Sequence, residues 1–240
     1  MAFRTVISVI LLLAMWSTCA YGDDGQAAFA QFVEAYREKT LTTPGAASLK
    51  ARPGTFLSNQ GIGPVAAGVS REELAQLLRA YIAGKYRDDA AWSLSRFIRY
   101  KTVRGAQPGG ENTEFAEASR FLAELAARLK LRFKDMEGKF VEISLPGGEP
   151  PLGVIGHMDV VPADETGWKF PPFSGVIADG RVWGRGAQDD KGAVISAIYA
   201  LAALRDAQVK MRNRVVLLVG TAEESSSDDV AGTRGPVMAA

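Results

Sequence analysis

Apolar residues along the first half of the chain recur every three to four positions in several stretches, which predicts amphipathic helices. The first such stretch covers residues 26–41, and a second begins at Ser70, where Glu73 completes a capping-box pattern. A third, shorter helix is expected over residues 90–100. Asn112 precedes a fourth stretch, in which the i, i+3, i+4 spacing continues to Leu129. We expect a linker or loop over residues 41–69, which are rich in Pro, Gly, Ala and Ser.

The second half of the chain alternates short β-branched runs with one long apolar stretch. Residues 193–204 are apolar almost all round, so this helix should be buried on more than one side. Strands are expected at residues 131–137, 140–145, 152–157 (as a buried strand) and 215–219 (as a central parallel strand), and Asp179-Gly180 predicts a hairpin joining 175–177 to 181–183. This order predicts an α/β fold with a mixed, mainly parallel sheet and flanking helices.

His157 is the only histidine among the 240 residues, and it lies at the end of a predicted strand. Side chains alternate between the two faces of a strand, so His157 and Asp159 should point the same way. A carboxylate beside an imidazole sets the histidine tautomer for metal binding or proton transfer. A lone histidine is also common as a satisfied core or surface residue, so the assignment needs support from elsewhere.

Two further acidic pairs stand where such a fold places its ligands. Asp189-Asp190 precede the apolar helix, and Glu223-Glu224 follow the 215–219 strand. Each has an ordinary alternative, a helix cap for the first and a solvated turn for the second. Together with His157 they form a coherent set, in which Asp189 bridges two cations, His157 and Glu224 each complete one side, and Glu223 handles a proton. Two cations would lower the pKa of a shared water from about 16 towards 7.

Composition narrows the function further. The chain has 28 basic and 27 acidic residues and a formal net charge of +1, so nothing indicates nucleic acid as a partner. The 47% hydrophobic residues suffice for a packed core, and the single cysteine excludes an internal disulfide framework. With one histidine and one cysteine, a metal site must rest largely on carboxylates.

The first 22 residues have the layout of a secretory signal peptide. Arg4 lies in a short n-region, the apolar core runs over residues 6–16, and small residues surround Ala20 and Gly22. Cleavage there would remove Cys19 and release a secreted or periplasmic protein without a stable membrane span. The alternative is an uncleaved N-terminal anchor.

Three motifs together closely resemble the zinc exopeptidase family that includes dipeptidases, glutamate carboxypeptidase, aminoacylase and succinyl-diaminopimelate desuccinylase. They are Gly156-His157-Met158-Asp159-Val160-Val161-Pro162, Trp183-Gly184-Arg185-Gly186-Ala187-Gln188-Asp189-Asp190-Lys191-Gly192 and Thr221-Ala222-Glu223-Glu224-Ser225. The loop with Gly167-Trp168 and Pro172-Phe173 looks most like the dipeptidase branch. Its aromatic residues could line a pocket or pack on the sheet. A phosphate-loop interpretation of Gly184-Arg185-Gly186 lacks the remaining glycine pattern.

The resemblance implies a role for each candidate residue. His157, Asp189 and Glu224 would bind two Zn²⁺ ions, with Co²⁺ or Mn²⁺ as substitutes and Asp189 as the bridge. Asp159 would orient His157, and Glu223 would be the general base that activates the metal-bridging water. A cis peptide is expected between Asp189 and Asp190. The implied activity is hydrolysis of a dipeptide-like amide bond, with N-acyl-amino acid deacylation as the alternative within the family.

Family members are longer than this chain and have a further metal carboxylate, a late histidine and a dimerisation domain. We therefore expect a signal peptide (1–22), an N-terminal helix and linker (23–69), a partial metallopeptidase catalytic domain (70–230) and an unstructured tail (231–240). On this expectation activity is impaired, and the family-type homodimer does not form. A catalytically inactive metal-binding or structural fragment is the alternative of another class.

Overall fold

The computed structural model describes residues 71–105, 113–207 and 213–225. The predictions for residues 1–70 and 226–240, and the proposed caps Ser70 and Asn112, lie outside these ranges. The described chain forms α4 (Arg71–Lys85), α5 (Arg87–Ile98), α6 (Thr113–Arg128), β1 (Arg132–Met136), β2 (Phe140–Leu145), β3 (Gly148–His157), β4 (Val176–Ala178), β5 (Arg181–Trp183), α7 (Lys191–Asp206) and β6 (Asn213–Gly220). None of the described helices is long and apolar enough to cross a membrane.

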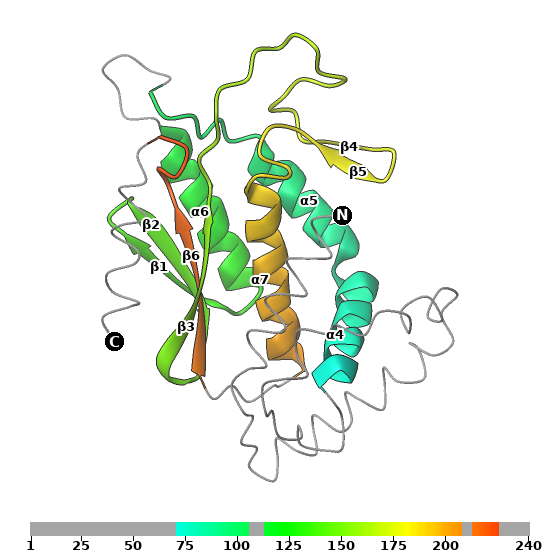
Figure 1. Ribbon diagram of the computed structural model, residues 1–240, viewed down its shortest axis with the longest axis vertical. Helices are drawn as coiled ribbons and strands as arrows, with labels where there is room; N and C mark the ends of the chain where they lie inside the picture. Colours follow the sequence, from blue (N-terminus) through cyan, green and yellow to red (C-terminus); the bar gives the residue numbers. More distant parts are fainter. Residues whose placement is uncertain (1–70, 106–112, 208–212, 226–240) are drawn as a thin grey trace, which may run out of the picture.

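Four strands form one sheet in the order β1-β2-β6-β3 (Figure 1). β6 lies inside the sheet, parallel to β3 and antiparallel to β2, while β1 and β2 are antiparallel. The expected α/β class and mixed sheet are confirmed. Two of the three pairings are antiparallel, however, so the expectation of a mainly parallel sheet is wrong for the described strands. β1 and β2 form a hairpin through Gly138, and a hairpin requires antiparallel strands.

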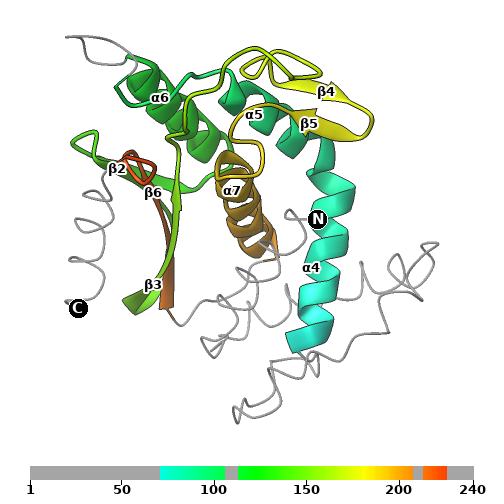
Figure 2. The same ribbon diagram turned by 45° about the horizontal axis from the view of Figure 1, so that its top comes forward.

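The main core lies between one face of the sheet and the helices. Figure 2 shows α6 and α7 beside the sheet, with α5 and α4 beyond α7. Almost every residue of α7 is buried, as its apolar sequence predicts, because sheet and helices enclose it from several sides. The core residues alternate along the strands with those of a smaller cluster on the other face, formed by Phe140, Val216 and Leu218 with Met136 against them.

The prediction that residues 152–157 form a buried strand is wrong in one respect. β3 is an edge strand of the described sheet, with β6 as its hydrogen-bonded neighbour, and Ile155 is 51% exposed. β3 also begins earlier than predicted, at Gly148, and includes Pro150 and Pro151 within the shift in register between Gly148 and Leu152. Prolines are tolerated there because an edge strand leaves part of its backbone without ladder hydrogen bonds.

The hairpin predicted at Asp179-Gly180 is confirmed. β4 and β5 pair around these two residues, both of which have positive φ, at 54° and 67°. Those angles match the turn that Asp-Gly sequences favour between antiparallel strands. The predicted helix of residues 90–100 is also present, although α5 starts three residues earlier, at Arg87.

Candidate metal centre

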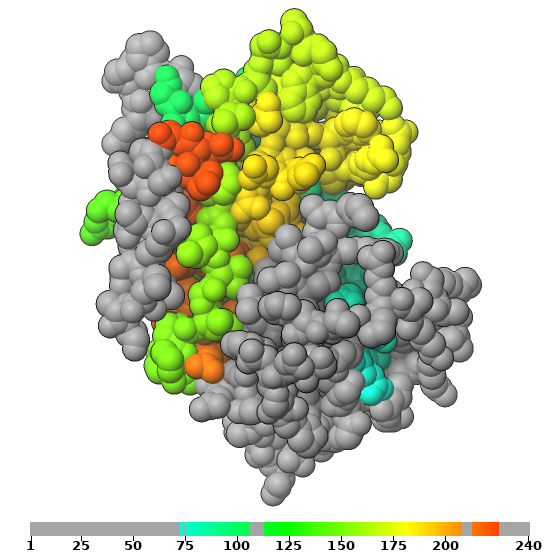
Figure 3. All heavy atoms as spheres, in the orientation of Figure 1, coloured from blue at the N-terminus to red at the C-terminus, as the bar shows by residue number. Residues whose placement is uncertain are grey.

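Three chain segments meet at one end of the sheet. The parallel register of β3 and β6 sets His157 opposite Gly220, so the two strands finish side by side. The turn after β6 carries Glu223 and Glu224, and the space-filling view shows this turn at the surface beside the end of β3 (Figure 3). Asp189 and Asp190 stand directly before α7. Carboxyl ends of parallel strands are the usual ligand-binding edge of an α/β sheet.

His157 presents its Nε2 atom to acidic side chains. Nε2 lies 3.1 Å from Asp189 Oδ1 and 3.7 Å from Glu223 Oε2. The other ring nitrogen, Nδ1, is 3.1 Å from the carbonyl oxygen of Asp159 and 3.4 Å from its Oδ1. When the ring is neutral, with its proton on Nδ1 toward Asp159, the Nε2 atom has a lone pair on the side of the acids that can bind a cation in place of a proton.

Asp159 is buried and has two tasks. Besides its contact with His157, its carboxylate accepts hydrogen bonds from the backbone N–H groups of Glu223, at 3.2 Å, and Glu224, at 2.9 Å. Burial by itself would raise the pKa of Asp159, but these bonds and His157 outweigh it and lower that pKa. The predicted contact with His157 is present. The hydrogen bonds from the Glu223-Glu224 turn to Asp159 were not predicted, because the partners are more than sixty residues apart in the sequence.

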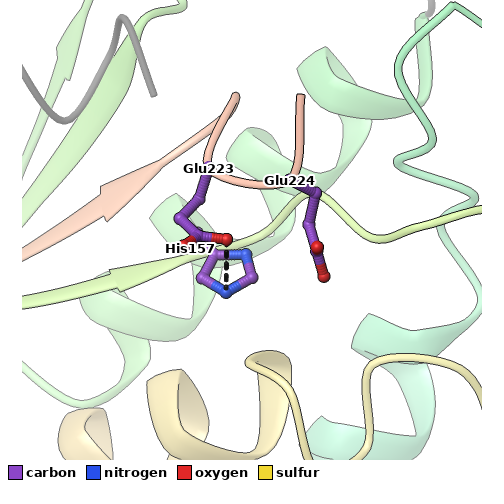
Figure 4. Close-up of side chains that lie close together, drawn as sticks. All are labelled: His157, Glu223 and Glu224. Carbon is purple, nitrogen blue, oxygen red and sulfur yellow. Dashed lines mark ion pairs between the residues drawn. The ribbon is translucent and has the colours of Figure 1, made fainter. Parts of the chain in front are cut away.

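Glu223 and Glu224 project from the same turn, with the Glu223 carboxylate against the His157 ring and the Glu224 side chain to one side of it (Figure 4). One ligand atom from each of His157, Glu223 and Glu224 lies within 4.8 Å of the others. Asp189 reaches His157 from the opposite segment, with 78% of its side chain exposed, while 49% of the Glu223 side chain is exposed. One imidazole and three accessible carboxylates therefore converge, a donor set that suits a divalent cation.

Asp190 occupies the N-cap position of α7, but its side chain makes no capping hydrogen bond. Its Oδ2 instead accepts a hydrogen bond from the backbone N–H of His157, at 3.2 Å. Burial raises the pKa of Asp190 to about 6. A Cβ atom at Gly156 would stand 2.6 Å from Asp190 Oδ2, so glycine permits this approach. The Asp189-Asp190 peptide is cis, as expected.

The acidic surroundings favour positive charge at His157. Burial lowers its pKa, but the bond to Asp159 and the charge of Asp190 raise it further, and the net effect is a pKa of about 9. Partial burial and the neighbouring Asp189 raise the pKa of Glu224. The neighbouring carboxylates that contribute to both shifts make this end of the sheet acidic.

The loop of residues 162–173 packs against the β4–β5 hairpin. The ring centres of Phe170 and Trp183 are 5.7 Å apart with the planes inclined at 65°, and the guanidinium carbon of Arg185 lies 5.3 Å from the centre of the Trp168 ring. Both contacts agree with the packing alternative for these aromatic residues. Their partners are Trp183 in the hairpin and Arg185 just after it, not the four-stranded sheet. Gly184 serves packing as well, since a Cβ there would stand 2.5 Å from Ile98 Cγ2.

Comparisons with known proteins agree with the resemblance seen in the motifs. Residues 153–239, which include all the candidate site residues, match Peptidase family M20/M25/M40. The chain is 34% identical over 143 residues to "Putative dipeptidase YtjP" of Bacillus subtilis, and 33% identical over 136 residues to "Putative dipeptidase SH1171" of Staphylococcus haemolyticus. These alignments cover 58% and 55% of this chain but only 31% and 29% of the two relatives, so the chain spans under a third of their length.

Solved structures share the fold. Human carnosine dipeptidase 1 matches with a TM-score of 0.56 at 21% identity, over 65% of this chain and 36% of that chain. The M20 family metallo-carboxypeptidase Sso-CP2 from Sulfolobus solfataricus matches with a TM-score of 0.51 at 26% identity, over 61% of this chain and 34% of that one. The first likeness concerns the fold alone. Together the comparisons show that this chain is similar to members of Peptidase family M20/M25/M40 and to putative dipeptidases.

Proposed function

We propose that the site of this chain takes part in metal-dependent hydrolysis of a dipeptide-like amide bond, because residues 153–239 match Peptidase family M20/M25/M40 and the chain is similar to putative dipeptidases. The observation that supports this most is the convergence of His157 with Asp189, Glu223 and Glu224 at one sheet edge. The chain spans under a third of the length of the curated relatives it matches. That this chain hydrolyses the bond by itself is therefore also proposed.

The donor set fits a divalent cation. Among the described residues, His157 is the only ion-pair partner of Asp189 and of Glu223, and all three carboxylates remain accessible. We assign His157, Asp189 and Glu224 as ligands, with Asp189 as the bridge if two ions bind. Zn²⁺ suits one imidazole among carboxylates, and Co²⁺ or Mn²⁺ can replace it. Bound ions would polarise the scissile carbonyl and lower the pKa of the attacking water.

Glu223 is assigned as the general base. Its carboxylate lies on the side of the imidazole that faces the other acids, and its partial exposure leaves room for a water molecule. In the proposed reaction Glu223 takes a proton from water as the oxygen attacks the amide carbon. It then passes this proton to the leaving nitrogen as the carbon–nitrogen bond breaks. Asp159 holds the backbone of Glu223 and the ring of His157 in place during both steps.

The Glu223→Gln variant tests whether Glu223 acts as the general base or as a metal ligand. Hydrolysis of a simple dipeptide with added Zn²⁺, Co²⁺ or Mn²⁺ should fall about a hundredfold to ten-thousandfold, the usual worth of a general base. Zn²⁺ affinity should stay close to that of the parent chain, because glutamine keeps the shape of the side chain and other residues hold the ion. A chelator should abolish turnover by the parent.

Other results of this experiment assign the site differently. Loss of Zn²⁺ binding in Glu223→Gln would make Glu223 a ligand rather than the base. Zn²⁺ binding by the parent without turnover under any of the three metals would identify this chain as an inactive metal-binding fragment. Hydrolysis of N-acyl amino acids in preference to dipeptides would favour the deacylase alternative.

Export is proposed from residues 1–22, which lie outside the described ranges. Their apolar core follows Arg4 and is followed by Ala20 and Gly22, the order of a secretory signal. Expressed in a bacterium, the chain should accumulate in the periplasm or medium with its N-terminus at Tyr21 or Asp23, as intact mass measurement would show. A membrane-bound product of full mass would indicate the uncleaved anchor instead.

A further inference from the structure

Residues 97–104, called here the 97–104 segment, touch all three chain segments that form the candidate metal centre. The segment covers the end of α5 and the chain that follows it. Figures 1 and 2 show the chain passing from α5 toward α6 at the end of the molecule where β3 and β6 finish. None of its residues is among the proposed ligands.

The first contact holds the start of α7. The side chain of Lys191 is fully buried, and its Nζ donates hydrogen bonds to the carbonyl oxygens of Phe97, at 3.2 Å, and Tyr100, at 2.7 Å. The same Nζ lies 5.1 Å from the centre of the Phe97 ring. Carbonyl groups at a helix C-terminus lack intrahelical partners, so an ammonium group is well placed there. Lys191 is two residues from Asp189, so this contact limits where that carboxylate can lie.

The second contact holds the end of β3. Thr102 is fully buried, its Oγ1 donates to the carbonyl oxygen of Met158 at 2.5 Å, and its own carbonyl accepts from the backbone N–H of Val160 at 2.9 Å. Met158 separates His157 from Asp159. Both hydrogen bonds therefore brace the short stretch that carries the imidazole and its carboxylate partner.

The third contact holds the turn after β6. Arg104 donates from Nε to the carbonyl oxygen of Thr221, at 2.5 Å, and from Nη2 to Thr221 Oγ1, at 2.7 Å. Thr221 is buried and stands two residues before Glu223. A guanidinium group offers its donors in a rigid planar fork, so this pair of bonds constrains direction as well as distance.

We propose that the 97–104 segment is a positioning element that sets the separation of Asp189, His157 and Glu223 and thereby tunes metal affinity. This inference rests on the proposed function, since it assumes that those residues bind a metal. A ligand set taken from three segments needs outer contacts to hold its geometry, and loss of such a contact typically costs 10- to 100-fold in metal affinity. A purely structural role would lower stability and leave the affinity of the folded chain unchanged.

The test compares two variants that each delete one buried hydroxyl group. Thr102→Val removes the bond to Met158, whereas Ser93→Ala removes a hydroxyl that lies 2.9 Å from Tyr199 Oη and contacts none of the three site segments. Zn²⁺ affinity is measured on the untagged chain by competition with a chromophoric chelator. Because His157 is the only histidine, its imidazole NMR signals report directly whether the ion binds there.

We expect Zn²⁺ affinity to fall about 10- to 100-fold in Thr102→Val and to stay at the parent value in Ser93→Ala, although both variants melt at lower temperature. Thr102→Ser, which restores the hydroxyl, should recover the affinity. Arg104→Lys provides a second comparison that does not alter the core, with Arg128→Lys as its control, because Arg128 pairs with Asp89 away from the site.

Two results would overturn the inference in distinguishable ways. Equal Zn²⁺ affinity in Thr102→Val and Ser93→Ala, together with equal affinity in Arg104→Lys and Arg128→Lys, would limit the 97–104 segment to a structural role while leaving the proposed function intact. Absence of saturable Zn²⁺ binding in the parent, with unchanged His157 signals, would overturn the proposed function and this inference together.

Discussion

The two ends of α7 each hold aspartate, but with opposite surroundings. At its C-terminal end, Asp206 accepts hydrogen bonds from Tyr81, at 2.6 Å, Tyr86, at 2.5 Å, and Lys85, at 2.8 Å, and also pairs with Arg205. A carboxylate in the last turn of a helix is disfavoured by the helix dipole, so these donors are needed to hold it. They outweigh partial burial and lower the pKa of Asp206.

At the N-terminal end the balance is reversed. Asp189 and Glu223 share a single ion-pair partner among the described residues, the imidazole of His157, and both side chains remain open to solvent. Burial leaves Asp190 with a raised pKa, the opposite of Asp206. The Asp206 carboxylate accepts hydrogen bonds from donors of its own chain and so stabilises the fold. The exposed carboxylates of Asp189 and Glu223 lie close together with few such donors, so they can bind a cation from solution.

The largest expected effect separates the two ends by metal binding. His157→Asn removes the only imidazole, so Zn²⁺ affinity should fall by at least about a hundredfold, roughly 2.7 kcal/mol. The unfolding free energy without metal should fall as well, because His157 is buried against Asp159, so the affinity is measured under conditions where the variant is folded. Asp206→Asn is the matched control at the other end of α7 and should bind Zn²⁺ like the parent, as calorimetric titration would show. Equal affinity in His157→Asn and the parent would place the metal elsewhere.

The second-largest expected effect is a difference in unfolding free energy between variants at the two ends of α7. Asp206→Ala should lower the unfolding free energy by about 2 kcal/mol, because it leaves Tyr81, Tyr86 and Lys85 without their shared acceptor. Asp189→Ala, at an exposed side chain, should stay within about 0.5 kcal/mol of the parent. Urea denaturation in the presence of a chelator measures both. A larger loss for Asp189→Ala would contradict the division into a structural end and a ligand-binding end.

The smallest expected effect is on the loss of stability at acidic pH. The pKa of Asp206 is lower in the folded chain than in the unfolded chain, so the unfolded state takes up its proton first as the pH falls. The stabilisation from Asp206 is therefore complete above the unfolded pKa, about 3.9, and is lost as the pH falls through the lower folded pKa. Denaturation curves between pH 5 and pH 2 should show a shallower decline for Asp206→Asn than for the parent. Parallel declines would mean that other groups govern acid unfolding.

Local patterns predicted most of the secondary structure. α6, α7 and β6 were foreseen because periodicity and continuous apolar runs reflect how a side chain will be buried. The Asp179-Gly180 turn was foreseen because few residues adopt its backbone angles easily. β3 was taken for a buried strand because an apolar run does not reveal the number of its neighbours, and Ile155 proved exposed.

The residues that converge at this end of the sheet were selected from the sequence, whereas the hydrogen bonds that support them were not predicted. His157, Asp159, Asp189, Glu223 and Glu224 stand at predicted element ends, so their types and positions sufficed to select them. The carboxylate of Asp159 on the backbone of Glu223, and Thr102 on the backbone of Met158, left no pattern in the sequence. Such bonds join a side chain to a main-chain group, and every residue except proline has the same main-chain groups.

The sequence by itself predicted where most of the described elements form and which residues are candidates for the chemistry, because periodicity, turn propensity and donor type are properties of neighbouring residues. Only the tertiary structure decided that the Asp206 carboxylate is hydrogen-bonded by side chains of its own chain, while Asp189 and Glu223 face solvent beside one imidazole. That outcome depends on which donors the packing brings within about 3 Å, over separations of more than a hundred residues for Tyr81, Lys85 and Tyr86.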